Sequence, residues 1–288
     1  MAQAQTFDPI AFKQKTRQEW NDAADGWRRW CHVVEGKHGG QRHSAKLVKL
    51  ARIRSGMSVL DVGGGYGEPS LTAARVAGPK GRVVCSDISP GLLAFARERA
   101  REAGLDNIEF IEADAERLDF AKESFDAIVS RALLMFLPDV PGTLTRLRSF
   151  LKPGGRFAAS VWGDKSKVQF ATAGSVIADE LGLPPPPSGL PGVFALSDRR
   201  HLEMLVQEAG FQDVETGTVS VIFETETPAQ FTEFIRDVAP PFSVLLQDRT
   251  SVARERIWGK VTEAYGRFAD ASGRVRTINE AVWIAGTR

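Results

Sequence analysis

Residues 59–67 read Val-Leu-Asp-Val-Gly-Gly-Gly-Tyr-Gly, an apolar run with one carboxylate followed by four glycines in five positions. Glycine adds nothing to side-chain packing and costs backbone entropy on folding, so a cluster of glycines directly after a strand-like run needs a reason. We infer that a large group approaches the backbone closely here. The surrounding sequence indicates which group that is.

The chain around this cluster alternates between strand-like and helical patterns. Strands are predicted at 57–62, 82–86, 108–111, 125–130 and 156–161, helices at 42–54, 70–77, 90–103 and 139–150, and two last strands at 214–224 and 281–287. Single helices between strands imply parallel pairing through right-handed crossovers, and therefore an open α/β sheet. Ligands of such sheets bind beyond the carboxyl ends of the strands, which is where the glycine cluster falls.

Composition excludes several classes of protein. With 37 basic and 36 acidic residues, the 288-residue chain gives no overall reason to expect nucleic acid or an anionic membrane as a partner. No apolar run approaches a membrane span, the first residues lack the features of a signal peptide, and two cysteines are too few for a disulfide framework. We therefore expect a cytoplasmic protein with reduced cysteines.

The glycine cluster does not fit a dinucleotide. The motif G-x-G-x-x-G, counted from Gly63, requires a third glycine where Glu68 stands. Asp61 also precedes the glycines, and its carboxylate would repel a pyrophosphate but suits a cation or an ammonium group. A nicotinamide-dependent oxidoreductase is therefore disfavoured.

Two further carboxylates follow predicted strands. Asp87 stands at the end of the second strand, where a carboxylate can accept hydrogen bonds from both hydroxyls of a ribose. Asp114 stands just after the third strand, placed to take an exocyclic amine of a purine. A ribose, a purine and a positively charged amino-acid end, without a phosphate, describe S-adenosylmethionine.

Five stretches carry a resemblance to a known family. They are 59–67, Ser-Asp-Ile-Ser at 86–89, Glu-Ala-Asp-Ala at 112–115, Phe-Asp-Ala-Ile-Val-Ser at 125–130 and Leu-Lys-Pro-Gly-Gly at 151–155. In this order and spacing they resemble class I S-adenosylmethionine-dependent methyltransferases, most of all the small-molecule group of the ubiquinone/menaquinone-biosynthesis type. The resemblance implies an α/β fold with a Rossmann-like, seven-stranded, mostly parallel sheet, helices on both faces and an antiparallel last strand.

The resemblance also implies a cofactor site. The glycines would pass under the methionine part, Asp87 would bind the ribose, and Ile88 would cover the adenine. Asp114 and the amide of Ala115 would read the adenine edge, and the carbonyl of Ser130 would hold the amino group. Members often carry a tyrosine in the N-terminal helix, where this chain has Trp27. The predicted cofactor residues are Trp27, Asp61, Gly63, Gly64, Gly65, Gly67, Asp87, Ile88, Asp114, Ala115 and Ser130.

Several of these residues have a second interpretation. The glycines could form a tight strand–helix turn that binds nothing, and Asp114 could only cap a helix. Trp20, Trp27 and Trp30 are spaced to share one helical face, which is typical of core packing. The Lys-Pro-Gly-Gly stretch at 152–155 is predicted to be a structural turn.

No catalytic residue and no metal site is predicted. The four histidines lack metal-ligand spacing, and none is favoured as a general base. They are His32, His38, His43 and His201. Glu68 could lie beside the cofactor or only stabilise the start of a helix.

The rest of the chain is predicted to cover this site. Residues 1–41 would form an N-terminal helical cap, and residues 42–288 the methyltransferase domain, with helical inserts at about 164–192 and 228–273. The cap and both inserts leave the sheet on the ligand side, so we predict a mostly apolar lid of helices over the transferred methyl group. The alternative is a dimer interface.

The predicted reaction is in-line transfer of a methyl group to a small, largely apolar acceptor through an O, C, S or N nucleophile. At 130–133 the chain reads Ser-Arg-Ala-Leu and lacks the Asn/Asp-Pro-Pro-Tyr/Phe stretch of DNA and glutamine amino-methyltransferases. Two alternatives stay open: a cofactor-binding protein without transfer activity, and a macromolecule methyltransferase, because residues 28–56 hold eight Lys/Arg and one acid. Nucleic acid is disfavoured as a partner, a membrane is not expected, and a homodimer is possible.

Overall fold

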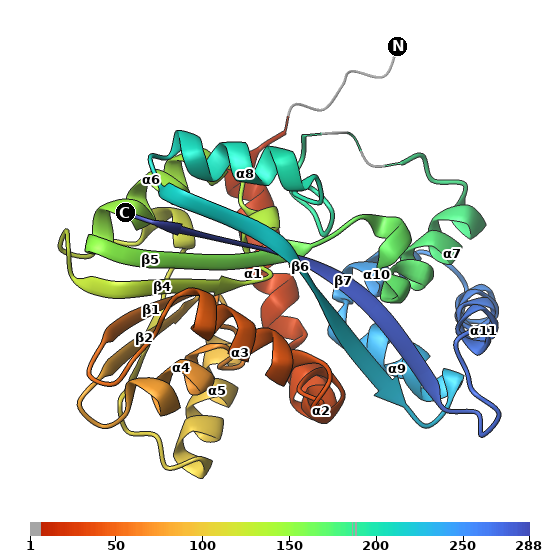
Figure 1. The fold of residues 1–288 in the computed structure, drawn as a ribbon. Helices are drawn as coiled ribbons and strands as arrows, with labels where there is room; N and C mark the ends of the chain where they lie inside the picture. The colour runs from red at the N-terminus through yellow and green to blue at the C-terminus, as the bar shows by residue number, and fades with distance from the viewer. Residues whose placement is uncertain (1–6, 186, 188) are drawn as a thin grey trace.

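A single seven-stranded sheet organises the computed structural model, which describes residues 7–185, 187 and 189–288. The strands are β1 (Ser58–Val62), β2 (Arg82–Asp87), β3 (Ile108–Glu112), β4 (Phe125–Arg131), β5 (Leu151–Trp162), β6 (Gln212–Thr225) and β7 (Val275–Thr287). Their order is β3-β2-β1-β4-β5-β7-β6, and β7 runs antiparallel to both of its neighbours (Figure 1). The predicted Rossmann-like sheet with an antiparallel last strand is confirmed.

Helices cover both faces of the sheet, as predicted. They are α1 (Pro9–Asp22), α2 (Ala24–Val34), α3 (Gly40–Leu50), α4 (Ser70–Ala77), α5 (Pro90–Glu102), α6 (Val140–Phe150), α7 (Thr172–Leu181), α8 (Arg199–Glu208), α9 (Pro228–Val238), α10 (Pro240–Leu246) and α11 (Ser251–Gly266). In Figure 1, α3, α4 and α5 lie below the sheet, and α6 and α8 lie above it. In the described residues, no helix is both long and apolar enough to cross a membrane.

The central strands are apolar on both sides because both of their faces are covered. Val59 and Val83 pack against α3 and α4, whereas the next residues, Leu60 and Val84, pack into the cluster that contains α6 and α8. Successive side chains of a strand point to opposite faces. A strand buried on both faces therefore shows a continuous apolar run, which is the pattern that predicted these strands.

The strands β6 and β7 form a long ribbon that extends beyond the rest of the sheet (Figure 1). Helices α7, α9 and α11 pack against this extension around Phe231, Phe234 and Tyr265. β7 begins six residues earlier than predicted. The added residues include Thr277 and Asn279, which are polar but fully buried, so their hydropathy does not mark a strand.

The predicted turn at 152–155 proves to be a bulge within β5. Leu151 is paired with Phe125, and the next regular pair is Arg156 with Ala127, so four residues of β5 lie opposite Asp126 alone. Gly154 has a φ of 76°, a left-handed value that suits glycine. The bulge lies at the amino end of β5, away from the edge where ligands bind.

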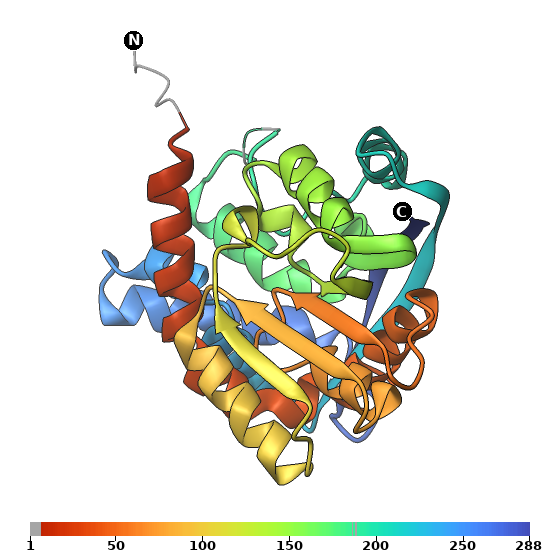
Figure 2. The ribbon, with the colours of Figure 1, turned by 90° about the vertical axis from the view of Figure 1, so that its left-hand side faces the viewer.

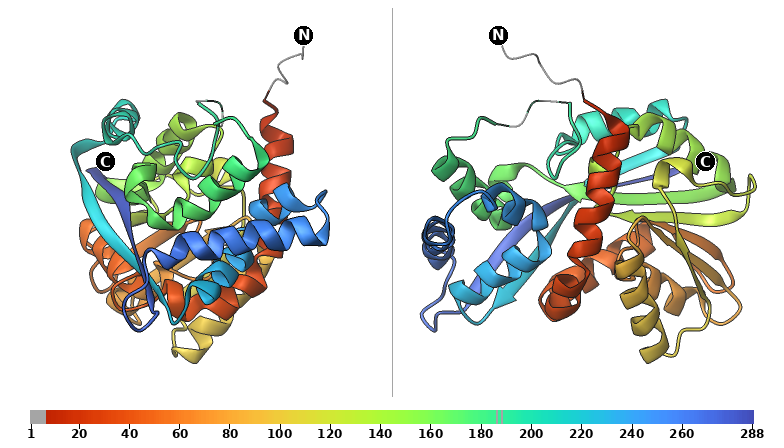
Figure 3. Two further views of the ribbon diagram at one scale, coloured as in Figure 1. Left: turned by 90° about the vertical axis from the view of Figure 1, so that its right-hand side faces the viewer. Right: turned by 180° about the vertical axis from the view of Figure 1, so that it is seen from behind.

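Helices α1 and α2 lie across the edge formed by the carboxyl ends of the parallel strands. Figure 2 shows α1 standing beside the ends of β2 and β3, and the right panel of Figure 3 shows it between the β1–β3 half and the helices of the β6–β7 ribbon. α1 contacts both α5 and α10. It buries none of its residues, so it covers this edge without belonging to the core.

Candidate active site

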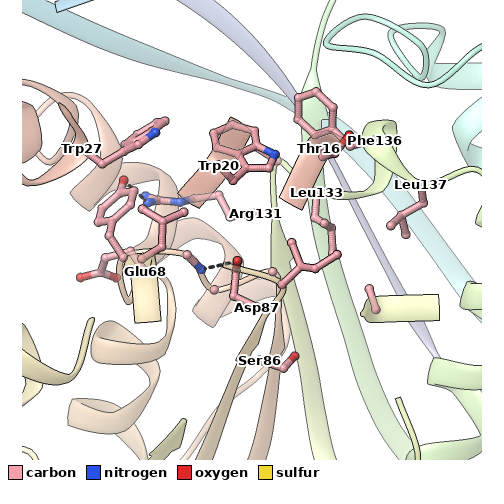
Figure 4. A pocket seen from close by; sticks show the side chains of 18 of the residues that line it. Thr16, Trp20, Trp27, Glu68, Ser86, Asp87, Arg131, Leu133, Phe136 and Leu137 are labelled. Atoms are coloured by element: carbon pink, nitrogen blue, oxygen red, sulfur yellow. Dashed lines mark hydrogen bonds between the residues drawn. The ribbon is translucent and has the colours of Figure 1, made fainter. Parts of the chain in front are cut away.

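A pocket opens at the carboxyl edge of the sheet, where the sequence predicted a ligand. Its wall comes from the ends of six strands and from helices α1, α2 and α3. Eight of the predicted cofactor residues line it: Trp27, Gly63, Gly64, Gly65, Asp87, Ile88, Asp114 and Ala115. Figure 4 shows this pocket, with Ser86 and Asp87 at its floor and Trp20 and Trp27 across from them.

The glycine cluster forms a bare backbone wall. Gly63 and Gly65 have φ values of 72° and 51°, in the left-handed region. A Cβ atom on Gly63 would come within 2.8 Å of the side chain of Leu133, so only glycine fits there. The amide of Gly63 donates to the carbonyl of Ser86 over 2.8 Å, which ties the loop to the end of β2. The backbone is thereby fixed and open to a ligand.

Asp87 is held at the pocket floor by backbone amides. Its Oδ2 accepts from Gly65 N and its Oδ1 accepts from Ser89 N, each over 2.8 Å. Burial raises the pKa of Asp87 to about 6, and the backbone hydrogen bonds oppose this rise. At neutral pH the carboxylate is therefore ionised, with lone pairs left for further donors such as ribose hydroxyls.

Asp114 caps a helix, as its second interpretation held, and it also lies in the pocket wall, so its contact with adenine stays a prediction. Its Oδ1 accepts from Glu116 N and caps the short helix η1 (Ala115–Arg117), while the residue also lines the pocket. Its Oδ2 accepts from Lys13 Nζ of α1 over 2.6 Å, and Lys13 also reaches Glu116. Burial lowers the pKa of Lys13, but its hydrogen bonds and charge attraction to the two carboxylates give a net rise. These pairs tie α1 to the end of β3.

Three predicted residues, Asp61, Gly67 and Ser130, do not line the pocket. Asp61 is fully buried beneath the glycine loop, where its Oδ2 accepts from Ser70 Oγ over 2.6 Å, and burial raises its pKa to about 7. Ser130 Oγ donates to the carbonyl of Val62 over 2.9 Å. Asp61 and Ser130 thus support the loop or its strand from behind, and contact of all three residues with a cofactor stays a prediction.

The prediction that three tryptophans share one helical face is wrong. A helix break at Ala23 places Trp20 on α1, and Trp27 and Trp30 on α2. Trp20 and Trp27 face each other in the pocket, with ring centroids 6.1 Å apart. Trp30 instead donates from Nε1 to Asp237 over 2.7 Å and packs in the apolar cluster beside α9. Only two of the three are therefore placed to meet a ligand.

Trp27 presents an unsatisfied donor at the pocket wall. Its ring stacks on Tyr66 with centroids 5.1 Å apart, and its buried Nε1 has no hydrogen-bond partner among the described residues. An unpaired buried donor costs about 1–3 kcal/mol, which a ligand oxygen can recover. The bare glycine loop, the Asp87 carboxylate and this N–H together fit a cofactor with a ribose and a carboxylate.

A buried network beside Trp27 was missed by the sequence reasoning. Arg131 donates to Glu35 Oε1 over 2.8 Å, to Ser44 Oγ over 3.0 Å, and also to Gly40 O and the Tyr66 hydroxyl. Tyr66 itself donates to Glu35 Oε1 over 2.6 Å. Burial opposes the charge on Arg131, but its acidic neighbours raise its pKa. Glu35 is the one acid among eight bases at 28–56, a signal that could have singled out Glu35 but not its partner Arg131.

His43 is the second residue that sequence reasoning did not single out. It lies on the buried face of α3, lines the pocket, and its Nε2 is 2.7 Å from Ser160 Oγ of β5. Burial, and then the charge of Arg131, lower its pKa to about 3. The imidazole is therefore neutral at physiological pH.

Beyond these groups the pocket continues between apolar walls. Trp162 at the end of β5 and Val221 and Phe223 on β6 form this part. The predicted cofactor residues that line the pocket follow β1, β2 and β3 or lie on α2, so the region over β5 and β6 is left for another molecule. From β3 to β5 the sheet spans about 19 Å at the usual strand spacing.

Comparisons with known proteins agree with this architecture. A family model described as "Methyltransferase domain" matches residues 53–178. The ubiquinone/menaquinone biosynthesis C-methyltransferase UbiE of Vibrio vulnificus (strain YJ016) is 32% identical over 226 residues, which covers 73% of this chain and 80% of that enzyme. The aklanonic acid methyltransferase DauC of Streptomyces sp. (strain C5) is 40% identical over 113 residues, 39% of this chain and 51% of that protein.

Other matches are shorter or structural. The chain spans 43% of the length of the UbiE enzymes of Pseudomonas putida that it also matches. The solved structure of the cyclase SpnF superposes with a TM-score of 0.60 over 95% of each chain, at 18% identity, which is a likeness of fold. The long match to the Vibrio enzyme, together with the family model, shows that the chain belongs to the S-adenosylmethionine-dependent methyltransferases, in the family that includes the ubiquinone/menaquinone biosynthesis C-methyltransferases.

Proposed function

We propose that this protein transfers the methyl group of S-adenosylmethionine to a small, largely apolar acceptor that binds over β5 and β6. The observation that carries this proposal is the extension of the pocket past the predicted cofactor residues, between Trp162, Val221 and Phe223. A polymer such as DNA needs an open basic groove, whereas this end of the pocket is lined mainly by apolar side chains and neutral polar groups. The names of the relatives, which refer to quinone biosynthesis and to aklanonic acid, support a small acceptor.

In this proposal the cofactor lies along the ends of β3 to β1. Asp87 accepts from the ribose hydroxyls, Ile88 and Ala115 flank the adenine, and Asp114 binds its amine. Trp27 donates from Nε1 to the carboxylate, in place of the hydroxyl of a tyrosine. Each contact uses a group that lines the pocket.

The chain contributes position and a dry environment to the reaction. The bound cofactor supplies an activated methyl group on a sulfonium. The walls hold the nucleophile in line with that group, and orientation of this kind is worth about 7–11 kcal/mol. Apolar walls also favour a step in which an anionic nucleophile neutralises a cation, since water stabilises the separated charges.

The lid that we propose is narrower than the one predicted from the sequence, because no pocket-lining residue in the described part of the chain comes from the inserts at 164–192 and 228–273. Thr16 and Trp20 of α1 and Trp27 of α2 line the pocket directly, so the N-terminal segment covers it. α9 contributes indirectly. Its Phe234 packs on Phe223 of the pocket wall, with ring centroids 5.6 Å apart, but Phe234 does not itself line the pocket. The domain limits at residue 41, a cytoplasmic location and a homodimer stay predictions.

The test is a transfer assay with cofactor labelled on the methyl group. Phenols, quinols, thiols and amines of small size are offered separately, and the label is followed into each acceptor. We expect transfer to at least one class, and loss of that transfer when Phe223 is changed to Asp. Micromolar binding of the cofactor without transfer to any of the four classes would contradict the proposal.

A further inference from the structure

The buried network around Tyr66 reaches the cofactor end of the pocket at Trp27. The rings of Tyr66 and Trp27 stack at an interplanar angle of 18°. The Tyr66 hydroxyl is hydrogen-bonded to Glu35 and Arg131. We propose that Tyr66 is a positioning residue, which aims the Nε1–H of Trp27 at the carboxylate of the cofactor. Glu35 and Arg131 hold Tyr66 in the orientation that this requires. This inference rests on the proposed function.

No hydrogen bond of its own orients the Trp27 ring. Its buried Nε1 has no partner among the described residues, so packing contacts decide where this N–H points. The ring centroid of Trp20 is 6.1 Å away, whereas that of Tyr66 is 5.1 Å away and its ring is nearly parallel. Figure 4 shows the nitrogen of Trp27 on the side that faces Trp20 across the pocket. The direction of this donor therefore depends chiefly on Tyr66.

Both hydrogen-bonding functions of the Tyr66 hydroxyl are used. The hydroxyl donates to Glu35 Oε1 over 2.6 Å and accepts from Nη2 of Arg131. Burial raises the pKa of Tyr66 well above its usual range, so the hydroxyl keeps the proton that it donates. The backbone is fixed as well, because the carbonyl of Tyr66 accepts from Arg99 over 2.9 Å. The residue is thus held at its backbone and at the far end of its ring.

The two partners of the hydroxyl are anchored in other elements. Glu35 caps the carboxyl end of α2, the helix that carries Trp27. Arg131 at the end of β4 donates to Gly40 O over 3.2 Å and to Ser44 Oγ over 3.0 Å, both on α3. The network thereby joins the glycine loop to α2, α3 and β4. The indole keeps its place relative to the loop on which the cofactor is predicted to lie.

Stacking alone does not explain this arrangement. A phenylalanine ring at position 66 would also stack on Trp27, and it would have no hydroxyl to satisfy. Burying the charges of Glu35 and Arg131 costs free energy that an apolar pair of similar size would avoid. What the network adds is one fixed orientation of the Tyr66 ring. Because the neighbouring N–H of Trp27 is unpaired among the described residues and Trp27 lines the pocket, that orientation matters for a ligand.

The consequence is selective for one end of the cofactor. In the proposed function Trp27 meets the carboxylate, whereas Asp87 and Asp114 meet the ribose and the adenine. In the part of the chain that the structure describes, neither Asp87 nor Asp114 is hydrogen-bonded to the side chain of Tyr66. Loss of the Tyr66 hydroxyl should therefore weaken a ligand that carries the carboxylate and spare a ligand that lacks it.

The test compares two ligands by calorimetry. S-adenosylhomocysteine carries the amino-acid end, whereas 5′-methylthioadenosine has the same nucleoside and thioether without that end. Tyr66→Phe should weaken the binding of S-adenosylhomocysteine about 3- to 10-fold, the usual effect of one hydrogen bond, and leave the affinity for methylthioadenosine unchanged. In the Trp27→Phe background, which lacks the N–H, Tyr66→Phe should have no further effect on either ligand.

Two control variants separate this role from general effects. Asp87→Ala should weaken both ligands alike, because both contain the ribose. Tyr265→Phe removes the hydroxyl of the other tyrosine in the chain, which is fully buried, donates to Phe170 O over 2.7 Å and does not line the pocket. It should therefore leave both affinities unchanged. Urea denaturation of each variant reports that it is folded.

Three results would overturn the inference. They are an unchanged affinity of Tyr66→Phe for S-adenosylhomocysteine, an equal loss of affinity for both ligands, and a loss that persists in full in the Trp27→Phe background. Failure of the proposed function looks different: the two ligands would bind in the pattern described, and the labelled methyl group would reach none of the acceptors offered.

Discussion

The two ends of the pocket are built from different kinds of sequence. At the cofactor end, Gly63, Asp87 and Asp114 lie at or just beyond the ends of β1, β2 and β3, and most of their hydrogen bonds are to backbone groups nearby. At the acceptor end, the contacts join side chains that lie far apart, such as His43 and Ser160, 117 residues apart in the chain. The first end depends on strand ends and glycine, and the second on long-range packing. Variants should therefore affect the two ends separately.

The largest change is a loss of stability, which is expected when the buried network at the acceptor end is broken. Arg131→Met leaves Glu35, which is 7% exposed, without its cation, and breaking a buried pair in this way costs about 3–5 kcal/mol. Urea denaturation measures this loss. The double variant Arg131→Met/Glu35→Gln should recover part of it, because no buried charge then remains.

A matched control for this prediction is the exposed pair of Arg82 and Glu109. Exposed pairs contribute about 0–1 kcal/mol, so Arg82→Met should change the free energy of unfolding little. Equal losses in Arg82→Met and Arg131→Met would contradict the importance that we give to the buried network.

The next effect is expected at the cofactor end. Asp87→Ala removes the carboxylate that is predicted to bind the ribose, so the affinity for S-adenosylhomocysteine should fall by about 1.5–3 kcal/mol, measured by calorimetry. The affinity for the acceptor identified in the transfer assay should change much less. Phe223→Ala should show the reverse pattern, and a loss of both affinities in either variant would break the division into two ends.

The cofactor end depends on local contacts and the acceptor end on long-range contacts. This difference explains how much of each end could be predicted from the sequence. Asp87 and Gly65 were identified because a strand, a glycine and a carboxylate stand in a fixed local order, and local order is visible in a sequence. Arg131 lies in the stretch at 130–133, which was informative only because it lacks an Asn/Asp-Pro-Pro-Tyr/Phe motif. No residue near Arg131 in the sequence indicates its partner Glu35, which lies 96 residues earlier. The first half of β7 was missed for a related reason, since Thr277 and Asn279 are buried by partners elsewhere in the chain.

A smaller effect is expected where the two ends meet, at Trp27. Trp27→Phe removes the buried N–H that lacks a partner among the described residues but keeps a ring to stack on Tyr66. The affinity for S-adenosylhomocysteine should fall by about 0.5–1.5 kcal/mol, while the stability of the free protein should stay equal or rise. A fall in stability with unchanged affinity would assign Trp27 to packing alone. The matched control is Trp20→Phe, which makes the same change, loss of an indole N–H, in the facing ring on α1.

The pH dependence of binding should separate Asp87 from the rest of the pocket. Because the pKa of Asp87 is raised to about 6 in the folded protein, this carboxylate becomes protonated as the pH falls through 6, and cofactor affinity should fall with it. Protonation relieves the buried charge, so the contribution of Asp87 to the free energy of unfolding should increase over the same range. In Asp87→Asn the affinity should be lower at neutral pH, should approach that of the unaltered protein below pH 6, and should lack this step.

The most direct test of the account is a calorimetric titration of the unaltered protein with S-adenosylhomocysteine and, separately, with NADH. Asp61 beside the glycine loop and the absence of a third glycine in the dinucleotide pattern favour a nucleoside without phosphates. We predict micromolar binding of S-adenosylhomocysteine and no measurable binding of NADH. Comparable affinity for NADH, or no binding of S-adenosylhomocysteine, would contradict the account.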